Sequence, residues 1–413
     1  MWLWMYIDST IPSNMSRSFW QKHAKGPEVR CDIAIIGGGI IGCSAAYWLS
    51  RVLPERHVAI VEQGALASGA SGRNAGFLLQ GAGSDYRKDC SVFGAERARR
   101  LLRFTRESRD MVFEEIGSAA QLEPSGSLVA AGSEMEDRRL QEAVSLLRSD
   151  GTPAIYFSPD ETSRRISGRG FFGSLYVPSG AMMNPVSLVA AIAKKSEAEI
   201  LEHHPVQLVE ARSDGVYIET SARIVRAERV LVAMNAWLPT LFPALGRYVH
   251  PVRAQMLATK PMGERWLDVP VYSHDGFYYL RQTRTGILLA GGARQLHEDV
   301  EVGYDIQPTA PVQADIEAYL LQHFPRCSGM QVDLRWSGIM GFSPDGLPVI
   351  GSLPEIPGSL WAAGFTGHGM GYGFRFGKLL ADQMAYGRDA EAADLFSVDR
   401  FDSSTPSAVA AAS

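Results

Sequence analysis

Three glycines and a glutamate near the start of the chain have the types and spacing that bind a dinucleotide. Gly37, Gly39 and Gly42 match the pattern G-x-G-x-x-G, in which glycine permits a tight turn and the close approach of a pyrophosphate. Glu62 follows about 20 residues later, where such a site carries a carboxylate for the ribose hydroxyls. This arrangement predicts a bound adenine dinucleotide. The alternative is a glycine-rich turn in an α/β protein without a ligand.

A stretch of small and polar residues follows at residues 67–77. Its small side chains allow a ligand to lie close to the backbone. Four of its residues offer hydrogen-bond donors for phosphate or a ring edge: Ser68, Ser71, Arg73 and Asn74. By itself this stretch is also typical of an ordinary loop. Because it directly follows the ribose carboxylate, we expect it to continue along the same ligand.

A second glycine-rich stretch, GFTGHGMGYG, lies far along the chain at residues 364–373. We expect the two glycine-rich stretches to bind opposite ends of one ligand. His368 lies within the second stretch and is a candidate catalytic residue. The alternative is that its ring packs behind the loop.

The elements around these motifs predict an α/β protein. Residues 33–36 and the strand that ends at Glu62 flank a turn and a helix, which makes a βαβ unit. Caps, turns and apolar periodicity predict the other elements: a helix at 184–200 with Asn184 as N-cap, strands around a turn at Asp214-Gly215, a hairpin at 276–293, a strand at 359–365 and a helix at 373–385.

Composition excludes several classes of protein. A chain of 413 residues is too long for one ordinary core, so we expect two domains. A net charge of −5 indicates no surface for nucleic acid. The four cysteines include no C-x-x-C pair, so neither a dithiol centre nor a metal site is expected, and a reducing, cytoplasmic location is favoured.

Two further stretches lack a functional signal. The apolar start of the chain, residues 1–10, is too short for a membrane span and lacks the features of a signal peptide. The arginine-rich stretch at residues 96–110 has apolar residues at helical spacing and interleaved acids. This pattern favours a solvated helix face over an anion site.

Four stretches together resemble the D-amino-acid oxidase superfamily of FAD-dependent oxidoreductases: DIAIIGGGIIGCSAAYWLS, VAIVEQGALASGASGRNAG, GFSPDGLPVIG and LWAAGFTGHGMG. The branch that they resemble most contains glycine and sarcosine oxidases and γ-glutamylputrescine oxidases. The resemblance implies a glutathione-reductase-like FAD-binding domain and a mixed-sheet, α+β substrate domain. It extends from Cys31 to about Ala385.

Rossmann-like elements lie at the start, middle and end of the chain, and no linker separates two sequential halves. We therefore expect a discontinuous FAD-binding domain at 28–86, 171–245 and 333–395, a substrate domain at 87–170 and 246–332, and extensions at 1–27 and 396–413. The role of the bound dinucleotide as FAD comes from the resemblance. The resemblance also assigns the residues that bind FAD: Gly37, Gly39, Ile40, Ile41, Gly42, Glu62, Gln63, Ser68, Ser71, Gly72, Arg73, Asn74, Ala75, Gly76, Val206, Asn235, Phe365, Thr366, Gly367, Gly369, Met370 and Gly371.

The second glycine-rich stretch takes its role from this resemblance. In the family, the corresponding loop packs along the flavin ring, and the next helix directs its N-terminus at the pyrimidine edge. Backbone N–H groups and the helix dipole there stabilise the negative charge that develops on reduction. The sequence itself favours FAD over NAD, because it has a single G-x-G-x-x-G and lacks the cysteine pair of the disulfide reductases.

The chain departs from the family at the positions nearest the flavin. Some members attach the flavin to a cysteine, but Gly338 occupies that position here and Cys327 is out of register, so we expect FAD to bind non-covalently. The arginine that binds a substrate carboxylate in glycine oxidases is replaced by Met340. The carboxylate ligands of sarcosine oxidases correspond to Leu79 and Gly371.

A lysine that promotes reaction with oxygen in sarcosine-oxidase-like members is also missing. The corresponding stretch, GILLAGGAR, contains no lysine. The electron acceptor is therefore oxygen or another molecule, and a dehydrogenase is possible as well as an oxidase. Arg281 is left as a candidate for binding an anion. An exposed strand arginine is an equally good interpretation.

The resemblance implies an enzyme that oxidises the C–N bond of an amine or amino acid by hydride transfer to the flavin, which gives an imine that hydrolyses. The catalytic candidates are His368 and Arg281. The pocket candidates are Phe77, Tyr278, Arg281, Trp336, Met340 and Tyr372. Two alternatives are open: oxidation of a C–OH substrate such as a hydroxy acid or glycerophosphate, with His368 or His250 as the base, and a non-catalytic FAD-bound partner protein.

Overall fold

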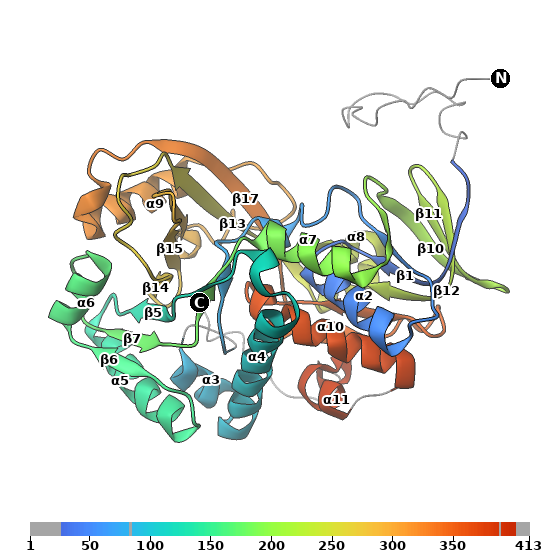
Figure 1. The fold of residues 1–413 in the computed structure, drawn as a ribbon, viewed down its shortest axis with the longest axis horizontal. Helices are drawn as coiled ribbons and strands as arrows, with labels where there is room; N and C mark the ends of the chain where they lie inside the picture. The colour runs from blue at the N-terminus through green and yellow to red at the C-terminus, as the bar shows by residue number, and fades with distance from the viewer. Residues whose placement is uncertain (1–25, 82–84, 388–389, 402–413) are drawn as a thin grey trace.

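The computed structural model describes residues 26–81, 85–387 and 390–401. Within them, two large β-sheets lie towards opposite ends of the long axis of the molecule, and helices cover them (Figure 1). The mixed α/β class predicted from the sequence is confirmed.

The first sheet carries the predicted βαβ unit. Its main strands are ordered β10-β11-β12-β1-β2-β9, with β19 beside β12 and β18 beside β19. Its strands are β1 (Val29–Ile36), β2 (Val58–Val61), β9 (Glu199–Leu201), β10 (Val206–Arg212), β11 (Gly215–Thr220), β12 (Ile224–Val232), β18 (Val349–Gly351) and β19 (Leu360–Ala363). β1 pairs in parallel with both β2 and β12.

Both faces of the first sheet are buried. Alternate residues of a strand face opposite sides of a sheet, and in β1 Ile33 and Ile35 pack into one apolar cluster while Ala34 and Ile36 pack into another. The first cluster includes the apolar faces of α2, α7 and α10. The continuous apolar run of β1 is typical of a parallel strand covered on both sides.

The second sheet is ordered β17-β13-β16-β15-β14-β5-β7-β6. Its strands are β5 (Ser127–Ala130), β6 (Ile155–Phe157), β7 (Ser174–Val177), β13 (His250–Thr259), β14 (Val271–Ser273), β15 (Tyr278–Gln282), β16 (Leu288–Gly292) and β17 (Val332–Phe342). β15 and β16 form the predicted hairpin. A small sheet of β3 (Phe77–Leu78), β8 (Ala181–Met182) and β4 (Glu123–Pro124) follows the loop at residues 67–76.

The α-helices of the described residues are α2 (Ile40–Val52), α3 (Tyr86–Phe93), α4 (Ala95–Glu115), α5 (Glu134–Ser149), α6 (Pro159–Ile166), α7 (Pro185–Ser196), α8 (Leu238–Leu241), α9 (Ala310–His323), α10 (Gly369–Tyr386) and α11 (Ala390–Phe396). The predicted cap of α7 is present, because Asn184 Oδ1 accepts from the N–H groups of Val186 and Ser187. α10 begins earlier than predicted, inside the second glycine-rich stretch, since tertiary packing overrides the low helix propensity of glycine.

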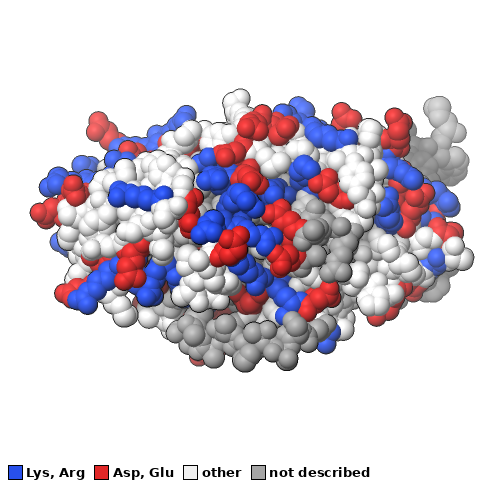
Figure 2. Space-filling model, turned by 90° about the horizontal axis from the view of Figure 1, so that it is seen from below, with Lys and Arg blue, Asp and Glu red and all other residues white. Residues whose placement is uncertain are grey.

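The arginine-rich stretch forms most of α4, with Leu101, Leu102 and Phe104 buried as its periodicity predicts. Its arginines meet acids rather than an open anion site. Arg99 Nε lies 2.8 Å from Asp150 Oδ1, and Arg100 pairs with Asp394. On the face seen from below, basic and acidic side chains are interspersed (Figure 2).

The predicted division into domains remains a proposal. Sheet membership differs from it at two strands, because β7 and β17 belong to the second sheet although their residues were assigned to the FAD-binding domain. The predicted extensions lie largely outside the described residues. None of the described helices is long and apolar enough to cross a membrane.

Candidate active site

The two glycine-rich stretches begin two helices that lie against each other. A Cβ on Gly373 of α10 would overlap Ile40 of α2, and a Cβ on Gly377 would overlap Ser44. The contacts advance by four residues on both helices, so α2 and α10 run parallel and begin at the same end of the sheet. Figure 1 shows the two helices side by side.

Neither helix start carries a side-chain cap or an acidic residue in its first turn. The first N–H groups of a helix have no partner within the helix. At α2 the N–H of Ile40 donates to Ser71 Oγ at 2.9 Å. The turn before α2 leaves no space for a side chain, because a Cβ on Gly42 would overlap the carbonyl oxygen of Gly37. Two helix N-termini without an acidic residue in the first turn, each with a partial positive charge, suit the phosphates and the electron-rich ring edge of a dinucleotide.

Glu62 follows β2 and lies beneath the first glycine turn, where the sequence predicts a ribose carboxylate. Its side chain is buried. Oε2 accepts from the N–H of Gly38 at 2.7 Å, and Oε1 accepts from the N–H of Gly64 at 2.8 Å. These two bonds fix the carboxylate beside the turn. Gln63 is exposed next to it, and Val206 begins β10 two residues after His204, whose N–H donates to the carbonyl of Glu62.

The loop at residues 67–76 uses two of its four predicted donors, Arg73 and Asn74, to hold its own backbone. Arg73 Nε donates to the carbonyl of Ser68, and Arg73 Nη1 donates to the carbonyl of Ser337 on β17. Asn74 donates to the carbonyls of Ala70 and Ser71 and accepts from the N–H of Gly76. These side chains therefore fix the shape of the loop.

The loop after β19 lies along the end of β17. The N–H of Thr366 donates to the carbonyl of Gly341 at 2.9 Å, and Asn235 Oδ1 accepts from the N–H of Gly364 at 3.0 Å. A Cβ on Gly367 would come within 3.5 Å of Met340 Sδ. Phe365 is buried against Phe376, so its side chain packs away from solvent.

One face of the second sheet is directed at both loops. Five residues from neighbouring strands form a row across it: Tyr272, Tyr279, Gly291, Met256 and Trp336. Trp336 Nε1 donates to the carbonyl of Arg73, and a Cβ on Gly338 would come within 3.1 Å of Arg73 Cβ. The ring of Phe77 meets that of Tyr272 at 5.2 Å. A mostly apolar, aromatic wall thus faces the loops that were predicted to bind the flavin.

Sequence reasoning missed Tyr272, Tyr279 and Met256 on this wall. Burial raises the pKa of Tyr272 to about 12 and also raises the pKa of Tyr279, so both phenols are neutral donors at physiological pH. Strand alternation would have identified Tyr279, because Tyr279 and Arg281 are two residues apart on β15 and therefore share a face of the sheet.

Two of the predicted pocket residues lie elsewhere. Tyr278 faces the opposite side of the sheet, where its ring stacks on Tyr319 of α9 with centroids 3.9 Å apart. Tyr372 is fully buried between α10 and its neighbours, with its ring 6.0 Å from those of Phe104 and Phe396. The structure brings Phe77, Trp336 and Met340 together and leaves Tyr278 and Tyr372 outside the group.

Arg281 reaches the loop with one nitrogen of its guanidinium, while its buried Nε has no hydrogen-bond partner among the described residues. Its Nη1 donates to the carbonyls of Gly76 and Met183, each at 2.8 Å, and lies 3.4 Å from that of Ala75. Burial lowers the pKa of Arg281 to about 10. Its contacts are those of a residue that joins β15 to the loop and to β8. They do not support the predicted exposed strand arginine.

His368 directly precedes α10, and its side chain is partly buried. Nδ1 lies 2.8 Å from the carbonyl oxygen of Thr366, so Nδ1 carries the proton and donates. Burial lowers the pKa of His368, although the Thr366 carbonyl opposes this. The imidazole is therefore neutral near pH 7, with Nε2 left as its acceptor. His250 begins β13 opposite Phe342 and is exposed.

The FAD-binding role of these residues stays a prediction. If FAD binds as predicted, the α2 turn and Glu62 would hold its adenosine and phosphates. The backbone of residues 74–76 and 366–371 would then lie along its ring. Within the described residues, no group of three or more His, Cys, Asp or Glu is arranged to hold a metal ion.

Comparison with known proteins gives consistent matches. A family model described as FAD dependent oxidoreductase matches residues 32–383. The glycine oxidase of Geobacillus kaustophilus (strain HTA426) is 27% identical over 367 residues, which cover 86% of this chain and 92% of that protein. The gamma-glutamylputrescine oxidoreductase of Escherichia coli (strain K12) is 26% identical over 390 residues, which cover 89% and 86%. A crystal structure of glycine oxidase from Geobacillus kaustophilus superposes with a TM-score of 0.76 at 24% identity and covers 89% of this chain and 98% of that one.

Proposed function

The chain belongs to the FAD-dependent oxidoreductase family, as the sequence resemblance predicted, and we propose that it oxidises the C–N bond of an amine or amino acid. The substrate loses a hydride from the carbon beside nitrogen and a proton from nitrogen, which gives an imine that water hydrolyses to a carbonyl compound and an amine. Bound FAD supplies the hydride acceptor. Both relatives described above are named for amine substrates.

One observation supports this proposal most directly. Two helices, with their N-termini at Ile40 and Gly369, begin at the same end of the first sheet, and the aromatic face of the second sheet lies opposite. The residues that we propose for FAD binding border this space, with Glu62 beside the turn that precedes α2. The residues of the chain bind and orient both reactants there, and the apolar wall excludes water.

The proposed substrate space lacks the side chains that bind a substrate carboxylate in the family. The corresponding positions in this chain are Leu79, Met340 and Gly371, and none of these residues binds an anion. A carboxylate buried beside the reacting carbon would be left without a partner, which is costly. We therefore propose a larger amine in preference to glycine, sarcosine or D-alanine.

The electron acceptor is oxygen or another molecule. The sequence of β16 contains no lysine, and Leu289 and Gly291 are its residues on the face of the aromatic wall. We propose that FAD binds without a covalent link, because Gly338 lies against Arg73 and provides no attachment atom. All four cysteines are free thiols, which suits the proposed cytoplasmic location.

The test mixes the FAD-loaded protein anaerobically with a panel of primary and secondary amines, hydroxy acids and glycerophosphate. Loss of flavin absorbance in a stopped-flow instrument measures the rate of reduction. The proposal requires that at least one amine reduces the flavin faster than any hydroxy acid or glycerophosphate. Faster reduction by a C–OH substrate would favour His368 as a general base. Failure of every donor would favour a non-catalytic FAD-bound protein. Reoxidation with air and with a dye then identifies the class of acceptor.

A further inference from the structure

Arg294 lies directly beyond β16, beside the aromatic wall, and sequence reasoning assigned it no role. Its side chain is 23% exposed. The guanidinium carbon lies 5.5 Å from the ring centroid of Phe277 and 5.2 Å from that of Phe342. Two aromatic rings thus hold the cation in place.

The guanidinium of Arg294 has few polar partners. Among the described residues its one ion pair is with Glu298, with Nη1 3.7 Å from Oε1, and Glu298 is itself 42% exposed. Arg253 and Arg281 on the same sheet, in contrast, donate several hydrogen bonds each. Burial lowers the pKa of Arg294, and the charges of Glu298, Tyr279 and Glu301 only partly oppose this, which indicates a partly desolvated cation.

Arg294 lies next to the proposed substrate space. Phe342, whose ring it contacts, is two residues after Met340 on β17 and therefore points to the same side of the strand. Met340 lies beside Gly367, and Phe342 pairs with Phe365 in the same loop. Positions 340 and 342 are separated by roughly 7 Å along an extended strand. The Arg294 guanidinium therefore lies away from Met340, the position that corresponds to the carboxylate-binding arginine of glycine oxidases.

We propose that Arg294 binds a carboxylate carried by the distal end of the amine substrate, several bonds away from the C–N bond that is oxidised. This inference rests on the proposed function and assigns the substrate a second, anionic end. A guanidinium held between two rings presents its free edge in a fixed orientation, which suits the two oxygens of a carboxylate. Glu298 is near enough to compete with that carboxylate.

The experiment separates anion binding from catalysis. FAD-loaded protein is titrated calorimetrically with pentanoate and with pentanamide, which differ in charge but hardly in size. In parallel, flavin reduction is measured with 4-(methylamino)butanoate and with the neutral N-methylbutylamine. The variants are Arg294→Met, Arg294→Lys and Glu298→Gln. Arg284→Met is the matched control, because Arg284 is 73% exposed, lies in the turn between β15 and β16 and pairs with Glu123 of β4.

The wild-type protein should bind pentanoate at least about tenfold more tightly than pentanamide, since each tenfold step corresponds to about 1.4 kcal/mol and a charge-assisted hydrogen bond exceeds that. Arg294→Met should remove this preference and leave reduction by N-methylbutylamine unchanged. Arg294→Lys should keep part of the preference, Glu298→Gln should strengthen it, and Arg284→Met should leave it intact.

Equal binding of pentanoate and pentanamide by the wild-type protein would overturn the inference. So would an Arg294→Met variant that weakens neutral and anionic ligands alike, because that result would mean a structural role between Phe277 and Phe342. If no amine reduces the flavin while pentanoate binding still depends on Arg294, the anion site stands and the proposed amine oxidation fails.

Discussion

Gly373 of α10 lies directly against Ile40, the first residue of α2, with no space between them for a side chain. One helical turn later, Gly377 is equally close to Ser44. This register makes the two helices parallel, so the positive ends of both helix dipoles lie at one end of the first sheet. The two glycine-rich stretches are thus parts of one structure: the first makes the turn before α2, and the second makes the start of α10 and its contact with α2.

Gly373→Ala should lower both stability and FAD retention. The new methyl group would overlap Ile40, and overpacking of this kind costs typically about 1–3 kcal/mol. We expect a lower thermal unfolding midpoint and loss of FAD on gel filtration. Gly246→Ala is the control, because a Cβ at Gly246 meets only Pro239, at 3.7 Å. Equal behaviour of the two variants would show that α10 moves aside without disturbing the site.

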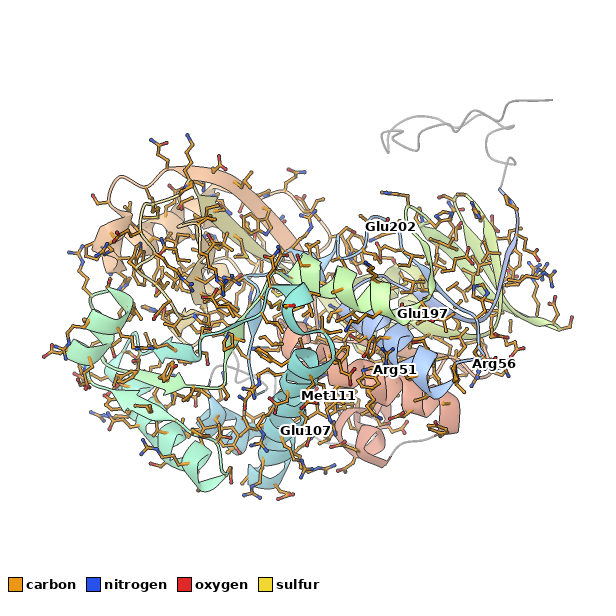
Figure 3. All side chains as sticks on the ribbon, viewed as in Figure 1. Arg51, Arg56, Glu107, Met111, Glu197 and Glu202 are labelled. Carbon is orange, nitrogen blue, oxygen red and sulfur yellow. The ribbon has the colours of Figure 1, made fainter. Side chains whose placement is uncertain are left out.

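Glu62→Ala should weaken FAD binding by about tenfold or more, because charge-assisted hydrogen bonds from the ribose are worth roughly 1.5–3 kcal/mol each. Fluorescence titration of the apoprotein with FAD measures the change. Glu202→Ala is the control: Glu202 Oε1 also accepts a backbone N–H, that of Leu66, and the residue lies on the outside of the same region (Figure 3). An unchanged FAD affinity for Glu62→Ala would mean that another residue holds the ribose.

The first sheet was predictable to within a few residues, whereas the substrate wall was not. β1, the α2 turn and Glu62 follow from a local motif whose residues are close in sequence. The wall depends on the pairing of five strands, which a single sequence does not specify. Part of the error was avoidable: Tyr278 and Arg281 are three apart on β15, so strand alternation alone places them on opposite faces.

The role of Arg281 was also beyond a sequence-based prediction. Its type and strand position suit a substrate anion, but the carbonyls of Gly76 and Met183 come close to it only in the folded chain. The predicted donors Arg73 and Asn74 show the same limit. Asn74 donates to a backbone carbonyl of its own loop, and Arg73 donates to the carbonyl of Ser337 on β17. No sequence motif specifies these partners.

Arg281→Met should destabilise the protein whatever the charge of the substrate. The variant removes two buried hydrogen bonds from a charged donor, and a group left without its partner costs about 1–3 kcal/mol. We expect a lower unfolding midpoint and weaker FAD retention, with neutral and anionic amines affected alike. A KM increase confined to anionic amines would return Arg281 to the substrate site.

Stability should fall as the pH drops below about 6.5. Burial, together with the nearby His323, lowers the pKa of His274, and burial also lowers the pKa of His368. Both histidines then take up protons in the unfolded chain, near its ordinary pKa of about 6.5, before they do so in the folded protein. Their effect on stability is absent above that pH and becomes unfavourable below it.

Unfolding midpoints between pH 7.5 and 5.5 test this expectation, since carboxylates contribute mostly at lower pH. His274→Asn should have a flatter profile than the wild-type protein, even if its midpoint at pH 7.5 is lower through loss of the contact with Ser273 Oγ. His203→Asn serves as the control, because His203 is exposed. Parallel profiles for the wild-type protein and His274→Asn would exclude His274 as a source of the pH dependence.

Glycine, sarcosine and D-alanine should reduce the flavin slowly, although relatives of this chain are named glycine oxidase. Each of these compounds places a carboxylate one bond from the carbon that would lose hydride. In this chain we expect Met340 and the backbone of residues 366–371 at that point, and Nη1 of Arg281 is bound to carbonyl groups. An anion there would give up its hydration without a compensating partner.

Stopped-flow reduction under anaerobic conditions compares these compounds with larger amines without assuming an acceptor. As a positive control, Met340→Arg should restore a cation at this position and improve reduction by sarcosine relative to the larger amines. Rapid reduction of the wild-type flavin by sarcosine would contradict the prediction, and would mean that a residue outside this wall binds the carboxylate.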